Sequence, residues 1–310
     1  MPKLGFWISL MAFFFITQSC GNASTKANQK FDWQGHRGAR GQVPENSIPS
    51  LQRALQDGVQ TLEFDVVITQ DSLVILSHEP WLNAQICQDS SGGNLEDKPE
   101  AYNIFKMTLA EVQQFDCGLK THPDFPAQEK YSVQKPTLID AIQACEEAAV
   151  MMNRDLPKYN IEIKSRPEWE GVFHPGYRVY TELVLEVLKL AQIEERTTLQ
   201  SFDERVLQYL KGQYPEQKIS LLVAADENKT VAEKIDALGF YPDVYSCEAS
   251  LVTQDMLTSL HAQKVEVIPW TVNEIEEAKR LIDLGVDGII TDYPGRLIPA
   301  LGSGSLSGEE

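Results

Sequence analysis

Short strand-like runs alternate with longer helix-like runs along most of the chain, and this alternation constrains the fold more than any other feature. Nine runs rich in β-branched and aromatic residues are strand candidates, at residues 31–36, 61–67, 73–77, 159–163, 197–201, 218–223, 243–246, 265–271 and 288–291. Seven runs with apolar residues at three- and four-residue spacing are helix candidates, at residues 46–56, 137–151, 177–191, 203–213, 231–238, 254–263 and 274–284. Such alternation predicts a parallel sheet covered by helices, and about eight units close into a barrel. We therefore expect the α/β class and a (β/α)8 TIM barrel over residues 31–301.

One strand candidate is surplus, because a barrel of this kind has places for about eight strands. The surplus lies between residues 61 and 77, where residues 69–72 form a turn too short to hold a crossover helix. Either 61–67 or 73–77 is therefore expected to be a hairpin excursion outside the barrel. The sequence leaves open which of the two it is.

Residues 79–135 interrupt the alternation. They are rich in Asp, Gly, Pro and Gln, and only residues 109–115, preceded by Thr108 as a helix cap, are expected to be ordered. Long loops without secondary structure are uncommon in compact domains unless they are functional. We therefore predict a loop-rich insertion after the second or third strand, on the face of the barrel that carries the active site.

The first twenty residues have the pattern of a bacterial lipoprotein signal peptide. Lys3 is followed by a mostly apolar run at residues 4–16, too short to span a bilayer comfortably, and then by Ser19 and Cys20. We expect processing and lipidation at Cys20, with residues 21–30 as a flexible tether. The alternative is an ordinary signal peptide in which Cys20 is incidental. The chain is exported in both cases, and in the first it is a periplasmic or outer-membrane-anchored lipoprotein.

Export would place the remaining cysteines in an oxidising compartment. Cys87 and Cys117 both flank the loop-like region, so a disulfide is expected between them. Cys145 lies on a helical stretch and Cys247 follows a strand, which favours buried free thiols. Their spacing does not suit a zinc site. Residues 302–310, in which Gly and Ser alternate, are expected to be disordered.

The charge balance argues against one class of partner. The 310 residues include 27 Lys and Arg against 45 Asp and Glu, for a formal net charge of −18. Such a chain would not neutralise a long run of phosphates, so we expect no nucleic-acid partner. A single phosphate can still be held by a local pair of cations or by a bound metal ion.

Ionisable residues gather at the carboxyl ends of four strand candidates, where barrels place their active sites. These residues are His36, Arg37, Glu63, Asp65, His78, Glu162 and Lys164. Residues two apart on a strand lie on the same side of it, so the side chains of Glu63 and Asp65 point the same way. The side chains of Glu162 and Lys164 also share one side of their strand. Taken singly, a strand-end histidine, a Glu-x-Asp pair or a Glu-x-Lys pair is more often structural. Their joint occurrence at four strand ends predicts a functional site.

The residue types suit metal-assisted phosphate chemistry. Three inward carboxylates require a cation, and oxygen ligands suit Ca²⁺ or Mg²⁺ rather than zinc. Arg37 and Lys164 match the oxygens of a phosphate. Histidines on two different strands, His36 and His78, can act as base and acid on opposite sides of a bond.

Seven short motifs follow one another along nearly the whole chain after residue 30. They are His36-Arg37-Gly38, Pro44-Glu45-Asn46-Ser47, Glu63-Phe64-Asp65-Val66, Glu162-Ile163-Lys164, Gln200-Ser201-Phe202-Asp203, Trp270-Thr271-Val272-Asn273, and Gly285-Val286-Asp287-Gly288 with Thr291-Asp292-Tyr293-Pro294. In this order they resemble the glycerophosphodiester phosphodiesterases, a family of TIM-barrel enzymes. The resemblance covers roughly Trp33 to Leu301.

The resemblance implies catalytic and metal-binding roles at the matching positions. His36 and His78 would form the acid–base pair. Glu63, Asp65 and Glu162 would bind one divalent metal ion, and the resemblance leaves Ca²⁺ and Mg²⁺ both open.

The resemblance also implies substrate contacts. Arg37 and Lys164 would hold the phosphate, and Trp270 would form the wall on the alcohol side, although an inward tryptophan can equally be barrel core. Glu45 and Asn46 would open the first helix close to the site, with Asn46 as its cap.

The implied reaction is hydrolysis of a glycerophosphodiester to sn-glycerol 3-phosphate and an alcohol. The family usually has Asp after the second histidine, whereas Glu79 follows His78 here. Two alternatives stay open: a phospholipase acting on lyso- or intact phospholipids, and a non-catalytic lipoprotein that binds glycerophosphodiesters. In each case the binding partner is a small molecule, and the protein would contact a membrane only through a lipid at Cys20.

Overall fold

A computed structural model describes residues 31–302, together with Met1. The predicted signal peptide, Cys20, the tether before Phe31 and residues 303–310 of the predicted tail lie outside the described residues. Within the described part, none of the helices has the length and apolar character needed to cross a membrane.

Eight parallel strands form a barrel, in the spatial order β8-β7-β6-β5-β4-β2-β1-β9. Their bounds are β1 (Asp32–Gly35), β2 (Thr61–Ile68), β4 (Lys158–Ile163), β5 (Thr197–Ser201), β6 (Lys218–Val223), β7 (Val244–Cys247), β8 (Glu266–Val267) and β9 (Gly288–Thr291). The two end strands are joined by backbone hydrogen bonds from Asp287 to the Val267 carbonyl and from Ile290 to the Pro269 carbonyl, each 3.0 Å long. The predicted (β/α)8 barrel is confirmed.

The surplus strand is the second of the two candidates. β3 (Val74–Leu76) pairs antiparallel with β2, so residues 61–68 form the barrel strand and residues 74–76 form the hairpin excursion. The turn between them is closed by the Thr69 hydroxyl, which donates to Asp71 Oδ1 at 2.6 Å.

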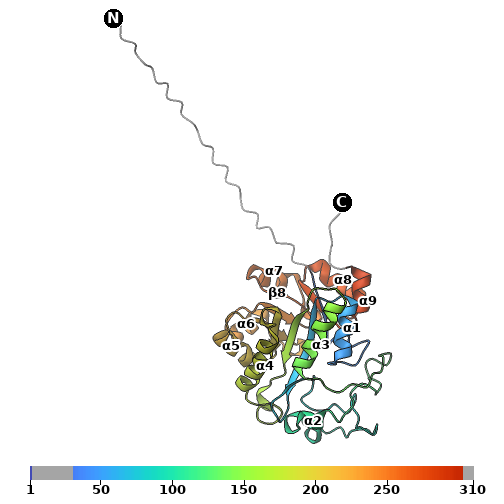
Figure 1. Ribbon diagram of the computed structural model, residues 1–310. Helices are drawn as coiled ribbons and strands as arrows, with labels where there is room; N and C mark the ends of the chain where they lie inside the picture. Colours follow the sequence, from blue (N-terminus) through green and yellow to red (C-terminus); the bar gives the residue numbers. More distant parts are fainter. Residues whose placement is uncertain (2–30, 303–310) are drawn as a thin grey trace.

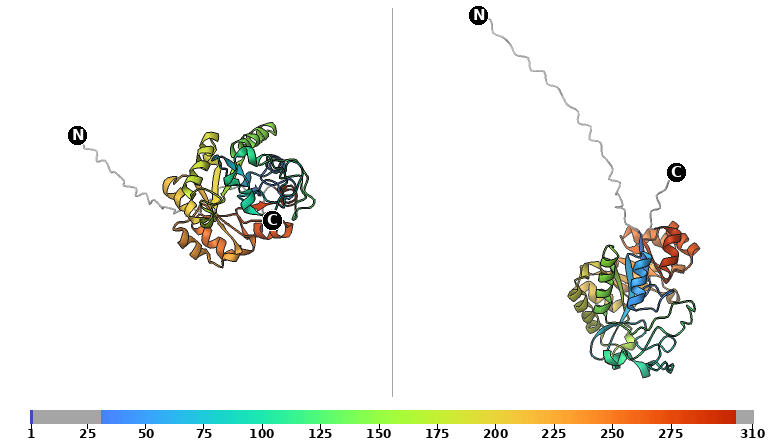
Figure 2. Two further views of the ribbon diagram at one scale, coloured as in Figure 1. Left: turned by 90° about the horizontal axis from the view of Figure 1, so that it is seen from below. Right: turned by 45° about the vertical axis from the view of Figure 1, so that its right-hand side comes forward.

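Helices cover the outside of the barrel (Figure 2). They are α1 (Ile48–Asp57), α3 (Leu138–Met151), α4 (Tyr177–Ala191), α5 (Glu204–Gln213), α6 (Val231–Leu238), α7 (Gln254–Ala262), α8 (Ile275–Leu284) and α9 (Pro294–Leu301). The seven predicted helices begin and end within two residues of these bounds. One large apolar cluster lies between strands and helices, and Trp33, Phe64 and Leu51 are fully buried in it.

Two predictions were wrong near the carboxyl end of the chain. The strand expected at residues 265–271 is only Glu266–Val267, because Pro269 has no N–H to give to a sheet. Helix α9 was missed because it contains Pro294 and Pro299. A proline is tolerated in the first turn of a helix, where its missing N–H would have no partner. Prolines are nevertheless usually taken as helix breakers, so the helix is hard to predict from the sequence.

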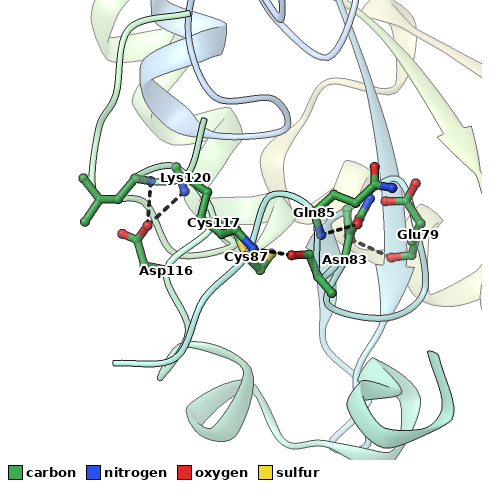
Figure 3. Close-up of a disulfide and its surroundings, with 11 residues drawn as sticks. Glu79, Asn83, Gln85, Cys87, Asp116, Cys117 and Lys120 are labelled. Carbon is green, nitrogen blue, oxygen red and sulfur yellow. Dashed lines mark hydrogen bonds between the residues drawn. A yellow bond between two sulfur atoms is a disulfide. The ribbon is translucent and has the colours of Figure 1, made fainter. Parts of the chain in front are cut away.

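The insertion at residues 79–135 packs around an apolar cluster that also includes Val67 of β2 and Ile75 of β3. It lies at the end of the barrel opposite to the one where the described chain begins and ends (Figure 1). It contains 3₁₀ turns at Pro99–Tyr102 and Ile104–Lys106, and α2 (Leu109–Val112). Thr108 caps α2, which is shorter than the ordered stretch expected at residues 109–115. A disulfide joins Cys87 to Cys117, and Figure 3 shows that it connects the stretch after Glu79 to the stretch around Asp116. Cys145 and Cys247 are buried and free.

Candidate functional site

A cavity of about 570 Å³ lies at the carboxyl ends of the strands. It gathers all seven ionisable residues that the sequence placed at strand ends, together with Trp270. The lining consists of His36, Arg37, Arg40, Glu63, Asp65, His78, Glu79, Trp81, Glu162, Lys164, Arg166, Trp169, Gln200, Phe202, Leu222, Trp270, Thr271 and Ile290. Side chains far apart in the chain therefore share one site.

The turn after β1 positions the first of these residues. Arg37 and Gly38 both have positive φ, 49° and 88°. A Cβ on Gly38 would lie 2.5 Å from the carbonyl carbon of Ser50, so the turn requires glycine. The backbone N–H of Arg37 donates to Glu63 Oε2 at 2.9 Å, and the Ser50 hydroxyl donates to the Arg37 carbonyl at 3.0 Å. The turn thus orients both Arg37 and Glu63.

Asn46 orients a carboxylate, and its predicted role as helix cap was wrong. Its Nδ2 donates to Asp65 Oδ2 at 2.9 Å, and its Oδ1 accepts from the Asp65 N–H at 3.1 Å. A cap residue needs extended backbone, whereas Asn46 has φ 51°. Ser47 is extended and caps α1, its hydroxyl oxygen accepting from the Ser50 N–H at 3.3 Å.

Glu63, Asp65 and Glu162 form a buried carboxylate cluster. One oxygen of each lies within 4.8 Å of the others, and none of the three residues is more than 7% exposed. Burial, and then repulsion by Asp65, raise the pKa of Glu63 well above its usual value. Burial also raises the pKa of Glu162 to about 7, although Lys164 opposes the shift. Burial alone would raise the pKa of Asp65 too, but Arg37, His78 and Lys164 lower it.

This donor set fits a hard divalent cation. All three groups offer carboxylate oxygens, which are the ligands that Ca²⁺ and Mg²⁺ prefer. Burial and mutual repulsion penalise three ionised carboxylates in one place, and a cation would remove that penalty. Glu63, Asp65 and Glu162 are therefore the residues that would hold the ion.

Two cations stand next to the carboxylates. Arg37 Nη1 lies 2.9 Å from Glu45 Oε1, and Arg37 Nε lies 3.3 Å from Asp65 Oδ2. Lys164 Nζ lies 2.8 Å from Glu162 Oε1 and 3.7 Å from Asp65 Oδ1. Burial alone would lower the pKa of both groups, but these carboxylates raise it, so both stay charged at neutral pH.

Each predicted catalytic histidine has a carboxylate on Nδ1. His36 Nδ1 lies 2.6 Å from Asp292 Oδ1, and His78 Nδ1 lies 2.7 Å from Glu79 Oε1. A hydrogen bond at Nδ1 fixes the ring and leaves Nε2 for proton transfer. Burial, Lys164 and Arg37 lower the pKa of His78. Glu79 is longer than the Asp that the family usually has at this position, and its carboxylate still reaches His78.

Aromatic rings form two walls of the cavity. Trp270 packs edge-on against Phe202 at 5.8 Å, and it also joins the apolar cluster inside the barrel, so it is both core and cavity wall. In a second group, Trp81 lies 5.8 Å from Trp169, with Phe173 in contact with both rings.

Sequence reasoning missed several residues of the site. Asp292 directly follows a strand, so the signal that identified His36 could also have found it. Gln200 belongs to a motif that was recognised but given no role, and Arg40 lies two residues after the first motif. Trp81 and Trp169 lie in segments without periodicity, and nothing in the sequence marks them.

The chain matches known proteins over nearly all of the described part. The sequence model of the "Glycerophosphoryl diester phosphodiesterase family" matches residues 36–296. A glycerophosphodiester phosphodiesterase of Caldanaerobacter subterraneus subsp. tengcongensis is 28% identical over 85% of this chain and 94% of its own. The mouse lysophospholipase D GDPD1 is 25% identical over 84% of this chain and 83% of its own.

Solved structures are similar as well. A Silicibacter pomeroyi DSS-3 protein, assigned as a glycerophosphoryl diester phosphodiesterase, has a TM-score of 0.77 and 29% identity, over 88% of this chain and 93% of its own. An Oleispira antarctica phosphodiesterase, solved with the product sn-glycerol-3-phosphate, shares the fold with a TM-score of 0.69 and 24% identity, over 88% of this chain and 97% of its own.

Proposed function

The chain belongs to the glycerophosphoryl diester phosphodiesterase family, and from that premise we propose that it hydrolyses glycerophosphodiesters to sn-glycerol 3-phosphate and an alcohol. One observation carries the proposal: a single cavity holds two carboxylate-anchored histidines and three clustered carboxylates, with Arg37 and Lys164 beside them. These are the groups that a phosphodiester hydrolysis needs for proton transfer and for charge stabilisation. The product that the reaction would release is the one bound to the Oleispira antarctica enzyme.

His36 and His78 move the protons in the proposed reaction. The glycerol hydroxyl next to the phosphate attacks phosphorus, and one imidazole Nε2 accepts its proton. The bond from phosphorus to the alcohol breaks, and the other imidazole gives a proton to the leaving oxygen. The histidines exchange roles when water opens the resulting cyclic phosphate, which restores both protonation states.

Arg37 and Lys164 hold the phosphate, and their carboxylate partners Glu45 and Glu162 orient them toward it. A divalent cation held by Glu63, Asp65 and Glu162 would polarise the phosphoryl group and acidify the attacking hydroxyl. Trp270 and Phe202 bound the substrate on the apolar side of the cavity.

The test is release of free alcohol by the protein lacking residues 1–20. Glycerophosphocholine and glycerophosphoethanolamine are supplied after chelator treatment, and then with Ca²⁺ or Mg²⁺ restored. We expect activity to vanish with chelator and to return with one of the ions. Folded protein that hydrolyses neither substrate under any of these conditions would overturn the proposal. Efficient turnover of a diester lacking the neighbouring hydroxyl would refute the cyclic course alone.

One observation favours a second candidate, lysophospholipase D activity. Trp81 and Trp169 line the cavity and pack against Phe173, which provides an apolar surface where an acyl chain could bind. We propose glycerophosphodiesters as the preferred substrates because ten of the eighteen residues that line the cavity are ionisable. The ratio of turnover on lysophosphatidylcholine to turnover on glycerophosphocholine decides between the two. A Trp81→Ala/Trp169→Ala variant should lose activity on the lysophospholipid more than on the water-soluble diester.

We also propose that the chain is exported and lipidated at Cys20. The Cys87–Cys117 disulfide supports export, because stable disulfides are typical of oxidising compartments. Labelling with a radioactive or clickable fatty acid tests this proposal in cells that express the full chain. Wild type should carry the label and Cys20→Ala should not, whereas an unlabelled wild type would favour an ordinary signal peptide.

A further inference from the structure

A chain of three amide side chains crosses the interior of the barrel. Its members are Gln34 on β1, Asn160 on β4 and Gln200 on β5, each no more than 3% exposed. Asn160 Nδ2 donates to Gln34 Oε1 at 2.8 Å and to Gln200 Oε1 at 3.1 Å. The chain ends on a carboxylate at both sides. Gln34 Nε2 donates to Asp32 Oδ2 at 2.8 Å, and Gln200 Nε2 donates to Glu63 Oε1 at 2.7 Å.

The hydrogen-bonding direction of this chain is fixed at its centre. An amide nitrogen only donates and an amide oxygen only accepts. Because Asn160 donates to both neighbours, each glutamine must turn its oxygen toward Asn160 and its NH₂ group away. Gln200 therefore meets Glu63 as a donor.

Glu63 depends on hydrogen bonds more than the other two carboxylates of the cluster do. Asp65 and Glu162 both lie within 4.0 Å of Lys164 Nζ, whereas within residues 31–302 Glu63 makes no ion pair of that length. One donor reaches each of its oxygens: the Arg37 N–H at Oε2 and the Gln200 amide at Oε1. These two bonds fix the carboxylate plane and leave a second lone pair on each oxygen for a cation.

We propose that Gln200 is a positioning residue for Glu63 in its role as a metal ligand, with Asn160 setting the direction of the Gln200 amide. The inference rests on the proposed metal site. Groups that hold a ligand in place matter for metal affinity, since an unconstrained carboxylate must be ordered when the ion binds. The competing interpretation is that the amides only fill the barrel interior, where Asn160 Oδ1 makes no hydrogen bond with the described residues.

The opposite end of the same chain supplies a matched control. Gln34 is the same residue type, is equally buried and is bonded to the same Asn160 nitrogen, but it ends on Asp32. Asp32 and Gln34 line a separate cavity of about 310 Å³, together with Lys158, Lys218 and other residues at the amino ends of the strands. Removing the Gln34 amide therefore disturbs the same network at a distance from the carboxylate cluster.

The experiment compares Gln200→Met with Gln34→Met in the full chain, because methionine keeps the length of the side chain and removes the donor. Binding of Ca²⁺ and of Mg²⁺ alone is measured by titration calorimetry at one pH, with thermal unfolding in chelator as the measure of structural damage. We expect Gln200→Met to weaken metal binding about 10–100-fold and Gln34→Met by less than about threefold. The two variants should lose similar stability in chelator.

Wild-type affinity in Gln200→Met would overturn the inference, and so would an equal loss of affinity in Gln34→Met. If wild type bound neither ion, the proposed metal site would itself fail, which distinguishes the two failures. Gln200→Asn keeps an amide but is one methylene too short to reach Glu63, and it replaces Gln200→Met if that variant does not fold. The same loss of affinity is expected from it.

Discussion

Nδ1 of His36 lies 2.6 Å from Oδ1 of Asp292, although 256 residues separate the two in the chain. Asn273 holds the other oxygen of this carboxylate, donating from Nδ2 at 2.7 Å. Burial alone would raise the pKa of Asp292, but His36 and Arg40 lower it, so the carboxylate is ionised at neutral pH. The pairing fixes the orientation of the imidazole and which of its nitrogens carries the proton.

Replacing Asp292 by Asn should therefore lower kcat about 100-fold, the low end of what proton transfer contributes, with little change in KM. Steady-state kinetics on glycerophosphocholine measure both constants. Asp287→Asn is the matched control, because Asp287 pairs with His261 at 2.8 Å near the start of β9, away from the cavity. Equal losses in the two variants would contradict the assignment.

Glu162→Gln should abolish metal binding without destabilising the metal-free protein. The Gln oxygen can still accept from Lys164, and burial already raises the pKa of Glu162 to about 7, so a neutral side chain should cost little there. Thermal unfolding in chelator should place the variant at or above wild type. An ion at 100 times its Kd should stabilise wild type by about 2.7 kcal/mol and leave the variant unchanged. Glu276→Gln, on the exposed side of α8, should respond to metal as wild type does.

Asp203→Asn should destabilise the protein at neutral pH and progressively less in acid. Asp203 caps α5 and accepts from Arg205 and from the Ser165 hydroxyl. Burial alone would raise its pKa, but these partners lower it. The stabilisation is thus complete above the unfolded-state pKa of about 3.9 and is lost as the pH falls through the lower folded-state value.

Thermal unfolding of wild type and Asp203→Asn at pH 7, 5 and 3 measures this difference. Asparagine is also a good cap and Arg205 is partly exposed, so we expect about 1 kcal/mol at pH 7, or roughly 2–4 °C in Tm. The difference in Tm between the two proteins should narrow at pH 3. A difference that does not change with pH would mean that the charge of Asp203 contributes nothing to stability.

Removing the Cys87–Cys117 bridge should loosen the insertion and leave the barrel folded. The bridge closes a loop with a sequence separation of 30 residues, so its loss should cost about 2–4 kcal/mol locally. The apolar cluster of the insertion is separate from the main barrel cluster and includes only Val67 and Ile75 from the sheet, which should confine most of the damage to residues 79–135. KM should rise because Glu79 and Trp81 line the cavity.

Limited proteolysis with peptide mapping checks where the loosening occurs. The Cys87→Ser/Cys117→Ser variant should be cut within residues 79–135, and wild type should resist under the same conditions. Cuts spread over the barrel helices would show instead that the bridge supports the whole fold.

The parts of the fold that could be predicted are those in which local chemistry and tertiary structure agree. Strand–helix periodicity gave the barrel, and position at strand ends gave the ionisable residues around Glu63. Pro269 and Pro294 interrupt the strand and helix patterns of the sequence. The backbone still follows the course of the barrel there, although a proline offers no N–H for a hydrogen bond. Asparagine is a residue type that often caps helices. The left-handed backbone of Asn46 excludes that role, and its side chain instead hydrogen-bonds to Asp65.

Contacts that depend on strand register were out of reach of the sequence. Gln200 meets Glu63 because β4 lies between β2 and β5 and brings the inward faces of all three together. The His36–Asp292 pair exists because β1 and β9 are neighbours. These residues can be recognised in the sequence, but the closure of the barrel determines which of them are in contact.

The described chain begins and ends at one end of the barrel (Figure 1), and the cavity lies at the other, at the carboxyl ends of the strands. Anything joined ahead of Phe31, whether a lipid at Cys20, a fusion partner or a solid support, is therefore attached on the side remote from the cavity. A molecule held by that end would present its catalytic mouth outward, so immobilised protein should meet dissolved substrate as freely as protein in solution.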